Sequence, residues 1–263
     1  MVNDPAARIA ARRSWGAYHW LRLETPAASQ ARPGQFLMIR TGDTTAPLLR
    51  RPISIHDGDG RTLDIFFQTA GRGTALLAAK KEGETLDILG PLGNGFDLSG
   101  PLEKEPAWLI GGGRGIAPLF FLGRILRERG ARVRVFYGGR TLADLPLRAK
   151  LAAAGLEVLG STDDGSFGYH GFITALLAAE LERSRPGRLF ICGPDPMMEK
   201  AADLALALAL PAQVSLESMM GCGFGACWGC VKRIRREGDA RWRKICEDGP
   251  VFRAEEIIWE GAG

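Results

Sequence analysis

Four of the five cysteines lie close together near the end of the chain, and this cluster constrains the fold more than any other feature. Cys222, Cys227 and Cys230 follow a C-x4-C-x2-C spacing, and Cys246 stands alone after them. Glycines alternate with the first three cysteines, as expected of a loop that turns tightly around a bound group and directs backbone N–H groups at it. The segment that carries these cysteines, Val214 to Gly263, is also too short to hold a large core without a metal.

Thiolates at this spacing are typical of a plant-type 2Fe-2S cluster. A structural zinc site with four thiolates is the alternative, but such sites usually pair two C-x2-C knuckles. Here the first gap is four residues and the last cysteine is isolated, so the spacing predicts that Cys222, Cys227, Cys230 and Cys246 bind a 2Fe-2S cluster. The gap before the last cysteine is shorter than in ordinary plant-type ferredoxins, which indicates a specialised cluster domain.

Composition and charge narrow the class of protein. A chain of 263 residues with 46% hydrophobic content can bury a core and divide into two or three units. Its net charge of +4 is small and its arginines are scattered among acids, which argues against nucleic-acid binding. No apolar run is long enough to span a membrane, and Met1 to Trp20 lacks the apolar stretch of a signal peptide. We therefore expect a cytoplasmic protein with a metal site rather than disulfides.

The first part of the chain predicts a small antiparallel barrel. Short alternating stretches are separated by Gly, Pro and Asp; they are Gly16 to Leu23, Gln35 to Arg40, Leu63 to Gln68 and Thr85 to Leu89. Between the last two, Thr74 to Lys81 is rich in helix formers and is closed by Gly83, which predicts one short helix. We expect this barrel domain to cover residues 1–101.

After Glu105 the sequence alternates between apolar strands, Gly-rich turns and longer helices, which indicates a parallel sheet covered by helices. The expected strands are Ala107 to Ile110, Val133 to Tyr137, Leu156 to Leu159 and Arg188 to Ile191. The expected helices are Ala117 to Arg129, Thr174 to Leu181 and Met197 to Leu210. We expect this α/β nucleotide domain at 102–212, followed by a cluster domain at 213–263.

Two motifs in the barrel region predict a flavin dinucleotide. Arg51 begins an R-P-I-S run that offers a forked cation for a pyrophosphate and a hydroxyl, on Ser54, for the flavin ring. Gly73 and Thr74 place backbone donors at a helix N-terminus, where phosphate is favoured. Singly, Arg51 could be a surface ion pair and Thr74 a helix cap, but the two motifs together in one barrel favour a flavin. The second phosphate loop favours FAD over FMN.

Two further loops predict a nucleotide site in the sheet domain. The run G-G-G-R-G-I-A-P from Gly111 follows a strand and begins a helix, where such domains hold a pyrophosphate. It is not a G-x-G-x-x-G motif, because Ile116 stands at the third glycine. The run C-G-P from Cys192 also follows a strand, although Cys192 alone is typical of a small buried hydrophobe. Asp163 and Asp164 are typical of turn residues, and no catalytic residue is predicted.

The order of these motifs resembles one known family. Along the chain the motifs are R-P-I-S and G-x-G-T, then G-G-G-x-G-I-A-P and C-G-P, then C-G-x-G-x-C-x-x-C and a late C-E-D-G-P-V-F. This order resembles that of iron-sulfur flavoprotein electron-transfer subunits of NAD-dependent dihydroorotate dehydrogenase, in the ferredoxin-reductase superfamily. The resemblance covers nearly the whole chain and is most specific in the cluster motif. It implies a flavin-binding antiparallel barrel, a parallel-sheet nucleotide domain and a small 2Fe-2S domain.

The resemblance also implies which residues bind each cofactor. The cluster would be held by the four cysteines named above. FAD would contact Arg51, Pro52, Ile53, Ser54, Phe66, Phe67, Gln68, Gly73 and Thr74. NAD(H) would lie against Gly111, Gly112, Gly113, Gly115, Cys192, Gly193 and Pro194. The chain departs from the pattern at Ile53, where many flavin reductases have Tyr, and at Arg114, where a small or apolar residue is common.

The implied function is electron transfer between NAD(H) and a partner protein. Flavin can exchange a hydride with nicotinamide and single electrons with the cluster. Because no acid–base set for an organic substrate is recognisable, that chemistry would belong to a partner. The resemblance implies an FMN-containing dihydroorotate dehydrogenase in a heterotetramer, making orotate for pyrimidine biosynthesis. The alternatives are a subunit of a hydrogenase, sulfide dehydrogenase or glutamate synthase complex, or a zinc-stabilised binding module.

The sequence favours NADH over NADPH. Gly138 to Asp144 follow the second sheet strand, where a parallel-sheet domain meets the adenine ribose. Recognition of a 2′-phosphate generally needs several cations there, because one exposed Arg contributes little discrimination. Arg140 is the only local cation, and Asp144 follows it closely.

Overall fold

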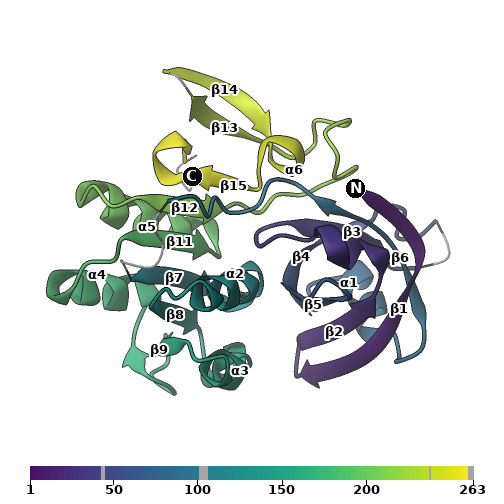
Figure 1. Cartoon of the computed structure of the whole chain (residues 1–263), viewed down its shortest axis with the longest axis horizontal. Coiled ribbons are helices and arrows are strands. Elements are labelled where there is room, and N and C mark those ends of the chain that lie inside the picture. Colours follow the sequence, from purple (N-terminus) through teal and green to yellow (C-terminus); the bar gives the residue numbers. More distant parts are fainter. Residues whose placement is uncertain (43–44, 101–105, 237, 260–263) are drawn as a thin grey trace. The chain divides into compact units, whose positions relative to one another are not determined.

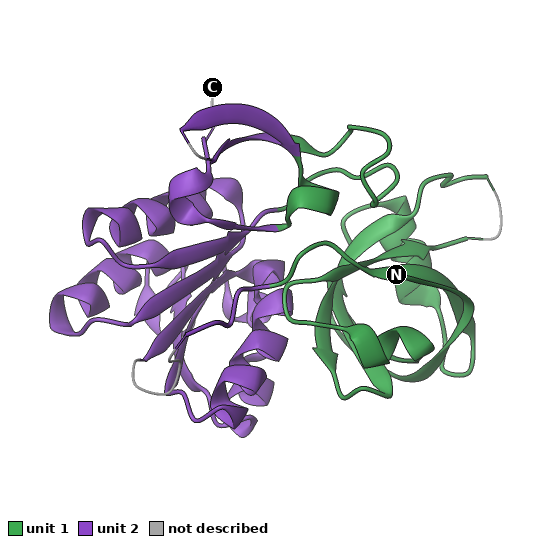
Figure 2. Ribbon diagram, turned by 45° about the horizontal axis from the view of Figure 1, so that its top comes forward, with its two compact units in different colours: residues 1–95, 217–231, 244–250 green, residues 96–216, 232–243, 251–263 purple. Residues whose placement is uncertain are grey.

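The computed structural model describes residues 1–42, 45–100, 106–236 and 238–259, which form two compact units (Figure 2). Unit 1 contains residues 1–95, 217–231 and 244–250. Unit 2 contains residues 96–216, 232–243 and those from 251 on. The cysteine-rich region thus contributes residues to both units, and the expected division into three domains stays a prediction.

Unit 1 is built on the predicted antiparallel barrel, which is closed by six strands (Figure 1). In barrel order the strands are β1 (Val2–Trp15), β2 (Tyr18–Glu24), β5 (Thr62–Gln68), β4 (Arg51–Gly58), β3 (Phe36–Arg40) and β6 (Thr85–Leu92). Alternate apolar residues fill the interior, among them the fully buried Leu21, Ile55 and Ile65. A 3-10 turn, η1 (Pro26–Gln30), and the helix α1 (Arg72–Ala79) complete it. The helix begins two residues before the predicted start at Thr74.

Unit 2 is built on a seven-stranded sheet, which confirms the predicted α/β domain. Its strands, in sheet order, are β10 (Tyr169–His170), β9 (Glu157–Thr162), β8 (Val133–Gly139), β7 (Ala107–Gly112), β11 (Arg188–Cys192), β12 (Ala212–Ser215) and β15 (Val251–Arg253). All neighbouring pairs are parallel except β12–β15. Every residue of the central strand β7 is buried, as expected of a parallel strand covered on both faces.

Four helices cover this sheet (Figure 1). They are α2 (Ala117–Glu128), α3 (Arg148–Ala153), α4 (Ile173–Arg183) and α5 (Asp195–Ala207). α2 and α3 lie on one face, and α4 and α5 on the other. Short 3-10 turns η2 (Gly113–Ile116) and η3 (Leu142–Asp144) follow β7 and β8. In the described part of the chain, no helix has the length and apolar character needed to cross a bilayer.

The strand order reverses between β7 and β11. β8 and β9 extend the sheet on one side of this pair, whereas β12 and β15 extend it on the other. Cys192, at the end of β11, is therefore paired with Gly111 near the end of β7. Ligands of open α/β sheets bind outside the carboxyl ends of strands at such a reversal.

The C-terminal elements follow β12 after an irregular loop. They are the two-stranded sheet of β13 (Val231–Arg236) and β14 (Asp239–Lys244), the short helix α6 (Ile245–Asp248), β15 and a 3-10 turn η4 (Ala254–Glu256). The cysteine-bearing loop and α6 belong to unit 1, and the rest of these elements belongs almost entirely to unit 2. All four predicted cluster ligands are consequently in one unit.

Candidate functional site

The four predicted cluster cysteines gather in unit 1 as two pairs. The Sγ atoms of Cys230 and Cys246 are 3.2 Å apart, and both side chains are buried. The thiols of Cys222 and Cys227 hydrogen-bond to each other, with Cys227 exposed and Cys222 half-buried. No group of three or more His, Cys, Asp or Glu side chains within the described ranges is arranged to hold a metal ion.

Backbone N–H groups are directed at the sulfurs of both pairs. The N–H groups of Phe224, Ala226 and Cys227 donate to the Cys222 thiol. Burial alone would raise the pKa of Cys222, but these donors outweigh it and lower the pKa to about 6. The N–H of Gly225 donates to the Cys246 Sγ at 3.2 Å. Such donors favour thiolate, the form that binds a metal, so this loop fits an iron-sulfur cluster.

Burial has the opposite effect at Cys246. It raises the pKa of this thiol to about 12, and the hydrogen bond with Cys230 contributes in the same direction. A neutral Cys246 thiol is thus favoured in the metal-free chain. A bound metal cation would reverse this preference by stabilising the thiolates.

Barrel residues hold the turn that carries Cys246. The Asn94 side chain donates to the carbonyl oxygens of Glu247 and Asp248 at 2.9 and 3.2 Å, and the Asn94 N–H donates to the Gly249 carbonyl. The sequence analysis did not single out Asn94, because its partners are 153 and 154 residues away. No local signal could have found it.

Lys244 lies at the start of the same turn and was also missed. Its Nζ donates to the Gly225 carbonyl at 3.0 Å, contacts the Glu247 carboxylate and lies 4.8 Å from the centroid of the Trp228 ring. The hydrogen bond to Glu247 raises the pKa of Lys244, so the side chain is an ammonium. Its place two residues before Cys246 was the available signal.

The predicted FAD residues lie on adjacent elements of unit 1. Arg51, Pro52, Ile53 and Ser54 begin β4; Phe66, Phe67 and Gln68 end the neighbouring β5; Gly73 and Thr74 are in the first turn of α1. The guanidinium of Arg51 lies directly over Gly73, so that a Cβ at Gly73 would overlap it. The structure therefore brings a forked cation to a helix N-terminus, an arrangement that suits a pyrophosphate.

The side chains of three other predicted FAD residues already have roles within the protein. The Thr74 hydroxyl accepts from the N–H groups of Ala70 and Gly71 and donates to the Gly71 carbonyl, so it caps its own helix. Phe66 is buried and stacks on Tyr18, with ring centroids 5.6 Å apart. Ile53 is also buried. Ile53 and Phe66 therefore belong to the barrel wall, and Thr74 stabilises the start of α1.

The predicted NAD loops meet at the strand-order reversal in unit 2. A Cβ at Gly115 would overlap the Cys192 carbonyl oxygen, and one at Gly112 would lie 2.9 Å from Pro194 Cδ and 2.6 Å from Met197 Sδ. Cys192 is buried, which agrees with its reading as a small hydrophobe. These glycines let the loops after β7 and β11 pack together, and the backbone N–H groups at the start of α2 remain the candidate phosphate donors.

The loop after β9 lies beside the loop after β8. The Asp163 N–H donates to the Gly139 carbonyl, and the Asp164 N–H donates to the Arg140 carbonyl, both at 3.1 Å. The Asp164 carboxylate accepts from the N–H and hydroxyl of Ser166, as expected of a turn residue. Arg140 is 82% exposed, and its Nε lies 3.8 Å from the Asp144 carboxylate. This edge of the sheet therefore carries more carboxylates than cations.

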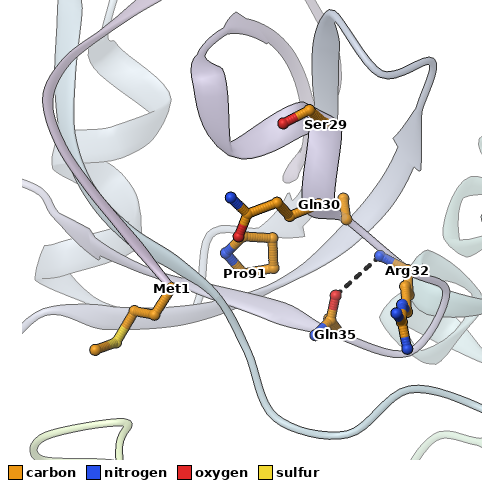
Figure 3. A pocket seen from close by; sticks show the side chains of 7 residues that line it. Met1, Ser29, Gln30, Arg32, Gln35 and Pro91 are labelled. Carbon is orange, nitrogen blue, oxygen red and sulfur yellow. Dashed lines mark hydrogen bonds between the residues drawn. The ribbon is translucent and has the colours of Figure 1, made fainter.

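A separate pocket of about 480 Å³ opens on the barrel (Figure 3). It is lined by Met1, Ser29, Gln30, Ala31, Arg32, Gln35 and Pro91, which include none of the predicted site residues. Gln35 organises this pocket, because its Oε1 accepts from the Arg32 N–H and its Nε2 donates to the Gly93 carbonyl, both at 2.9 Å.

Two protein-family models match this chain. Residues 217–258 match the iron-sulfur cluster binding domain of dihydroorotate dehydrogenase B, and residues 109–203 match an oxidoreductase NAD-binding domain. The first match contains all four paired cysteines, and the second contains both nucleotide loops.

Whole-chain relatives agree with these models. The dihydroorotate dehydrogenase B (NAD(+)) electron transfer subunit of Desulforamulus reducens is 36% identical over 245 residues, covering 92% of this chain and 93% of that protein. The protein of the same description from Geobacillus kaustophilus is 42% identical over 229 residues, covering 86% of each chain. A solved structure of an NADH-dependent reduced ferredoxin-NADP oxidoreductase superposes with a TM-score of 0.83 at 29% identity, covering 98% of this chain and 92% of that one. The chain belongs to the family of dihydroorotate dehydrogenase B electron transfer subunits.

Proposed function

We propose that this chain carries electrons between NAD(H) and a catalytic dehydrogenase subunit through FAD and a 2Fe-2S cluster. The observation that carries the proposal is the pairing of the four thiols, with backbone N–H groups directed at their sulfurs. The direction of electron flow that we propose follows the names of the relatives, which describe electron transfer subunits of a dihydroorotate dehydrogenase that uses NAD(+). The partner would oxidise dihydroorotate to orotate, and NAD+ would accept the electrons.

The two thiol pairs suit a cluster with two iron ions. Cys222 and Cys227 would bind one iron, and Cys230 and Cys246 the other. A single zinc ion would need all four thiols around one point, whereas here Cys222 contacts Cys227 and Cys230 contacts Cys246. This arrangement supports 2Fe-2S over zinc.

The contact between Arg51 and the start of α1 supports FAD. The Arg51 guanidinium and the N–H groups of the first turn at Gly73 could bind the two phosphates of the dinucleotide. Ser54, on the same strand as Arg51, would donate its hydroxyl to the flavin ring. Bound flavin would supply the conversion between two-electron and one-electron transfer.

The carboxylates at the edge of the sheet support NADH over NADPH. Arg140 is the cation nearest in sequence to the expected ribose site, and Asp144 lies beside it. The Asp163 N–H donates a hydrogen bond to the Gly139 carbonyl, which brings the exposed Asp163 carboxylate beside the loop after β8. A 2′-phosphate would meet these negative charges with one solvent-exposed arginine in compensation.

The partner and the setting follow from the same proposal. Because the chain's predicted sites contain no acid–base set for an organic substrate, an FMN-containing dihydroorotate dehydrogenase would provide it, in a heterotetramer in the cytoplasm. This chain's own residues would bind the cofactors and hold them in place.

The test is anaerobic reduction of the co-expressed complex. We expect iron and FAD in this chain, reduction of its flavin absorbance by NADH, and the same reduction by dihydroorotate only when the dehydrogenase subunit is present. A colourless, zinc-containing protein would overturn the proposal. Reduction by NADH but never by dihydroorotate with its dehydrogenase would move the chain to another NAD(P)-linked complex. Steady-state assays should give a higher kcat/KM with NADH than with NADPH.

A further inference from the structure

Lys244 connects the cysteine loop to the turn that carries Cys246. It is the last residue of β14 and immediately precedes α6 (Figure 1). Its side chain is only 17% exposed, although lysines are usually solvated. Its ammonium contacts the Gly225 carbonyl, the Glu247 carboxylate and the face of Trp228. One partly buried cation is thus shared by the loop and the turn.

The carbonyl that Lys244 binds belongs to a peptide unit that also faces a cysteine. The Gly225 carbonyl and the Ala226 N–H are the two ends of this peptide unit. The carbonyl accepts from Lys244 at 3.0 Å, while the Ala226 N–H donates to the Cys222 thiol. A cation at the oxygen polarises the peptide and strengthens the hydrogen bond made by its N–H.

The preceding peptide unit faces the other thiol pair. The Gly225 N–H donates to the Cys246 Sγ at 3.2 Å. Gly225 has φ +90, so its backbone conformation favours glycine, and a Cβ there would lie 2.6 Å from the Glu247 carboxylate oxygen. Lys244 therefore binds a residue whose two peptide units reach both pairs of sulfurs.

We infer that Lys244 is a positioning residue that raises the reduction potential of the cluster, an inference that rests on the proposed 2Fe-2S site. One-electron reduction would make the net charge of the cluster more negative by one, and a nearby cation would stabilise that charge. Stronger N–H···S hydrogen bonds act in the same direction, because net charge and hydrogen bonds to sulfur set cluster potentials. Glu247 opposes the effect but is 52% exposed, so solvent screens the carboxylate more than the ammonium.

The test is a redox titration of the complete holoprotein, monitored by the electron paramagnetic resonance of the reduced cluster. We expect Lys244→Met to shift the redox equilibrium about tenfold toward the oxidised cluster, which is 59 mV for one electron. The flavin midpoint should not change. Lys244→Arg should restore most of the wild-type value, because it keeps the charge. Lys232→Met is the matched control and should leave the cluster midpoint unchanged. Lys232 lies on β13, the strand paired with β14, and forms an ion pair with Asp195 of α5.

A second variant covers the case in which Lys244→Met fails to retain iron. Glu247→Gln keeps Lys244 and removes the opposing charge, so it should shift the potential upward. An unchanged or lowered midpoint in Glu247→Gln, an unchanged midpoint in Lys244→Met, or an equal shift in Lys232→Met would overturn the inference. A wild-type protein with no cluster signal would instead overturn the proposed function.

Discussion

The cluster loop and the nucleotide loops are both rich in glycine, but their glycines serve different physical needs. In the cluster loop, Gly223 and Gly225 have φ values of +85 and +90, a backbone conformation that other residues resist. In the nucleotide loops, Gly113 also has a positive φ, of +52, but Gly112 and Gly115 do not, and these two are needed because neighbouring atoms leave no room for a side chain. The first set directs N–H groups at thiols, whereas the second lets two loops pack together.

This difference predicts which substitutions affect which cofactor. In the cluster region the reacting atoms are side-chain sulfurs, so changing one thiol should remove the metal and leave the fold. In the nucleotide loops the binding groups are backbone atoms, so a change of volume should affect stability and affinity together.

The largest effect is expected from Cys227→Ser. Because the substitution removes one proposed iron ligand, most of the iron should be lost while the flavin stays bound. Iron and flavin analysis of the purified variant measures both. Cys192→Ser is the matched control, since Cys192 is buried in unit 2, and it should keep its iron. Equal loss of iron and flavin from Cys227→Ser would erase the distinction between the two regions.

A smaller effect is expected from Gly115→Ala. The added methyl group would overlap the Cys192 carbonyl, and a backbone atom cannot move aside cheaply. We expect a loss of about 2 kcal/mol in the free energy of unfolding and a KM for NADH raised by about tenfold. Denaturant unfolding and steady-state kinetics measure these quantities. Gly42→Ala, whose Cβ would lie 3.7 Å from Leu76 Cδ1, should change neither. A KM like that of wild type would argue against this loop as the nucleotide site.

Gly73→Ala should have a weaker effect than Gly115→Ala. Its methyl group would displace the Arg51 side chain, which is flexible and can adjust. We expect the Kd for FAD to rise by about three- to tenfold, or about 1 kcal/mol, with the iron content unchanged. Titration of flavin-stripped protein with FAD gives this number, and Arg51→Gln should produce a similar change. Unaltered FAD affinity in both variants would remove the pyrophosphate role of this pair.

The smallest effect concerns His19, which belongs to neither region. Burial and nearby Arg12 lower the pKa of His19 from its usual 6.5. The folded protein therefore resists a proton that the unfolded chain accepts, so this group costs stability as pH falls below about 6.5 and has no effect above it. When the pH is lowered from about 7.5 to 5.5, the free energy of unfolding should fall less in His19→Gln than in wild type. The difference should be a fraction of 1 kcal/mol, because the His19 ring is only partly buried. Urea unfolding at both pH values measures this fall. An equal fall in the variant and in wild type would contradict the prediction.

Sequence patterns predicted the elements whose residues repeat regularly. Apolar periodicity predicted β7, β8, β9 and β11 in the sheet and β2, β3, β5 and β6 in the barrel, and spacing predicted the four thiols. The short strands β10, β12 and β15, and β4 in the barrel, were not predicted. β1 was missed because Pro5 and several charged residues obscure its alternation, and only Ala7 and Ile9 are buried along it. Its pairing with β2 and β6, rather than its own composition, makes it a strand.

Contacts between distant residues could not be read from the sequence. Asn94 and Lys244 act on the cysteine region through backbone carbonyls, which carry no residue identity. The site at Thr74 shows the reverse case, because its helix-capping role was one of two readings and the structure bears it out through the bonds to Ala70 and Gly71. Chemistry that depends on spacing along the chain was predictable, and chemistry that depends on closure of the fold was not.

The division of unit 1 into separate stretches of chain has a consequence for biosynthesis. The barrel strands end at Leu92, but the fourth thiol and the turn that Asn94 holds arrive only with residues 244–250. Translation must therefore proceed as far as Cys246 before the last of these thiols exists. Loop closure over more than 150 residues also makes this a high-contact-order step. Closure of unit 1 is accordingly a late step in folding, and the first three thiols are translated before the residue that completes their set.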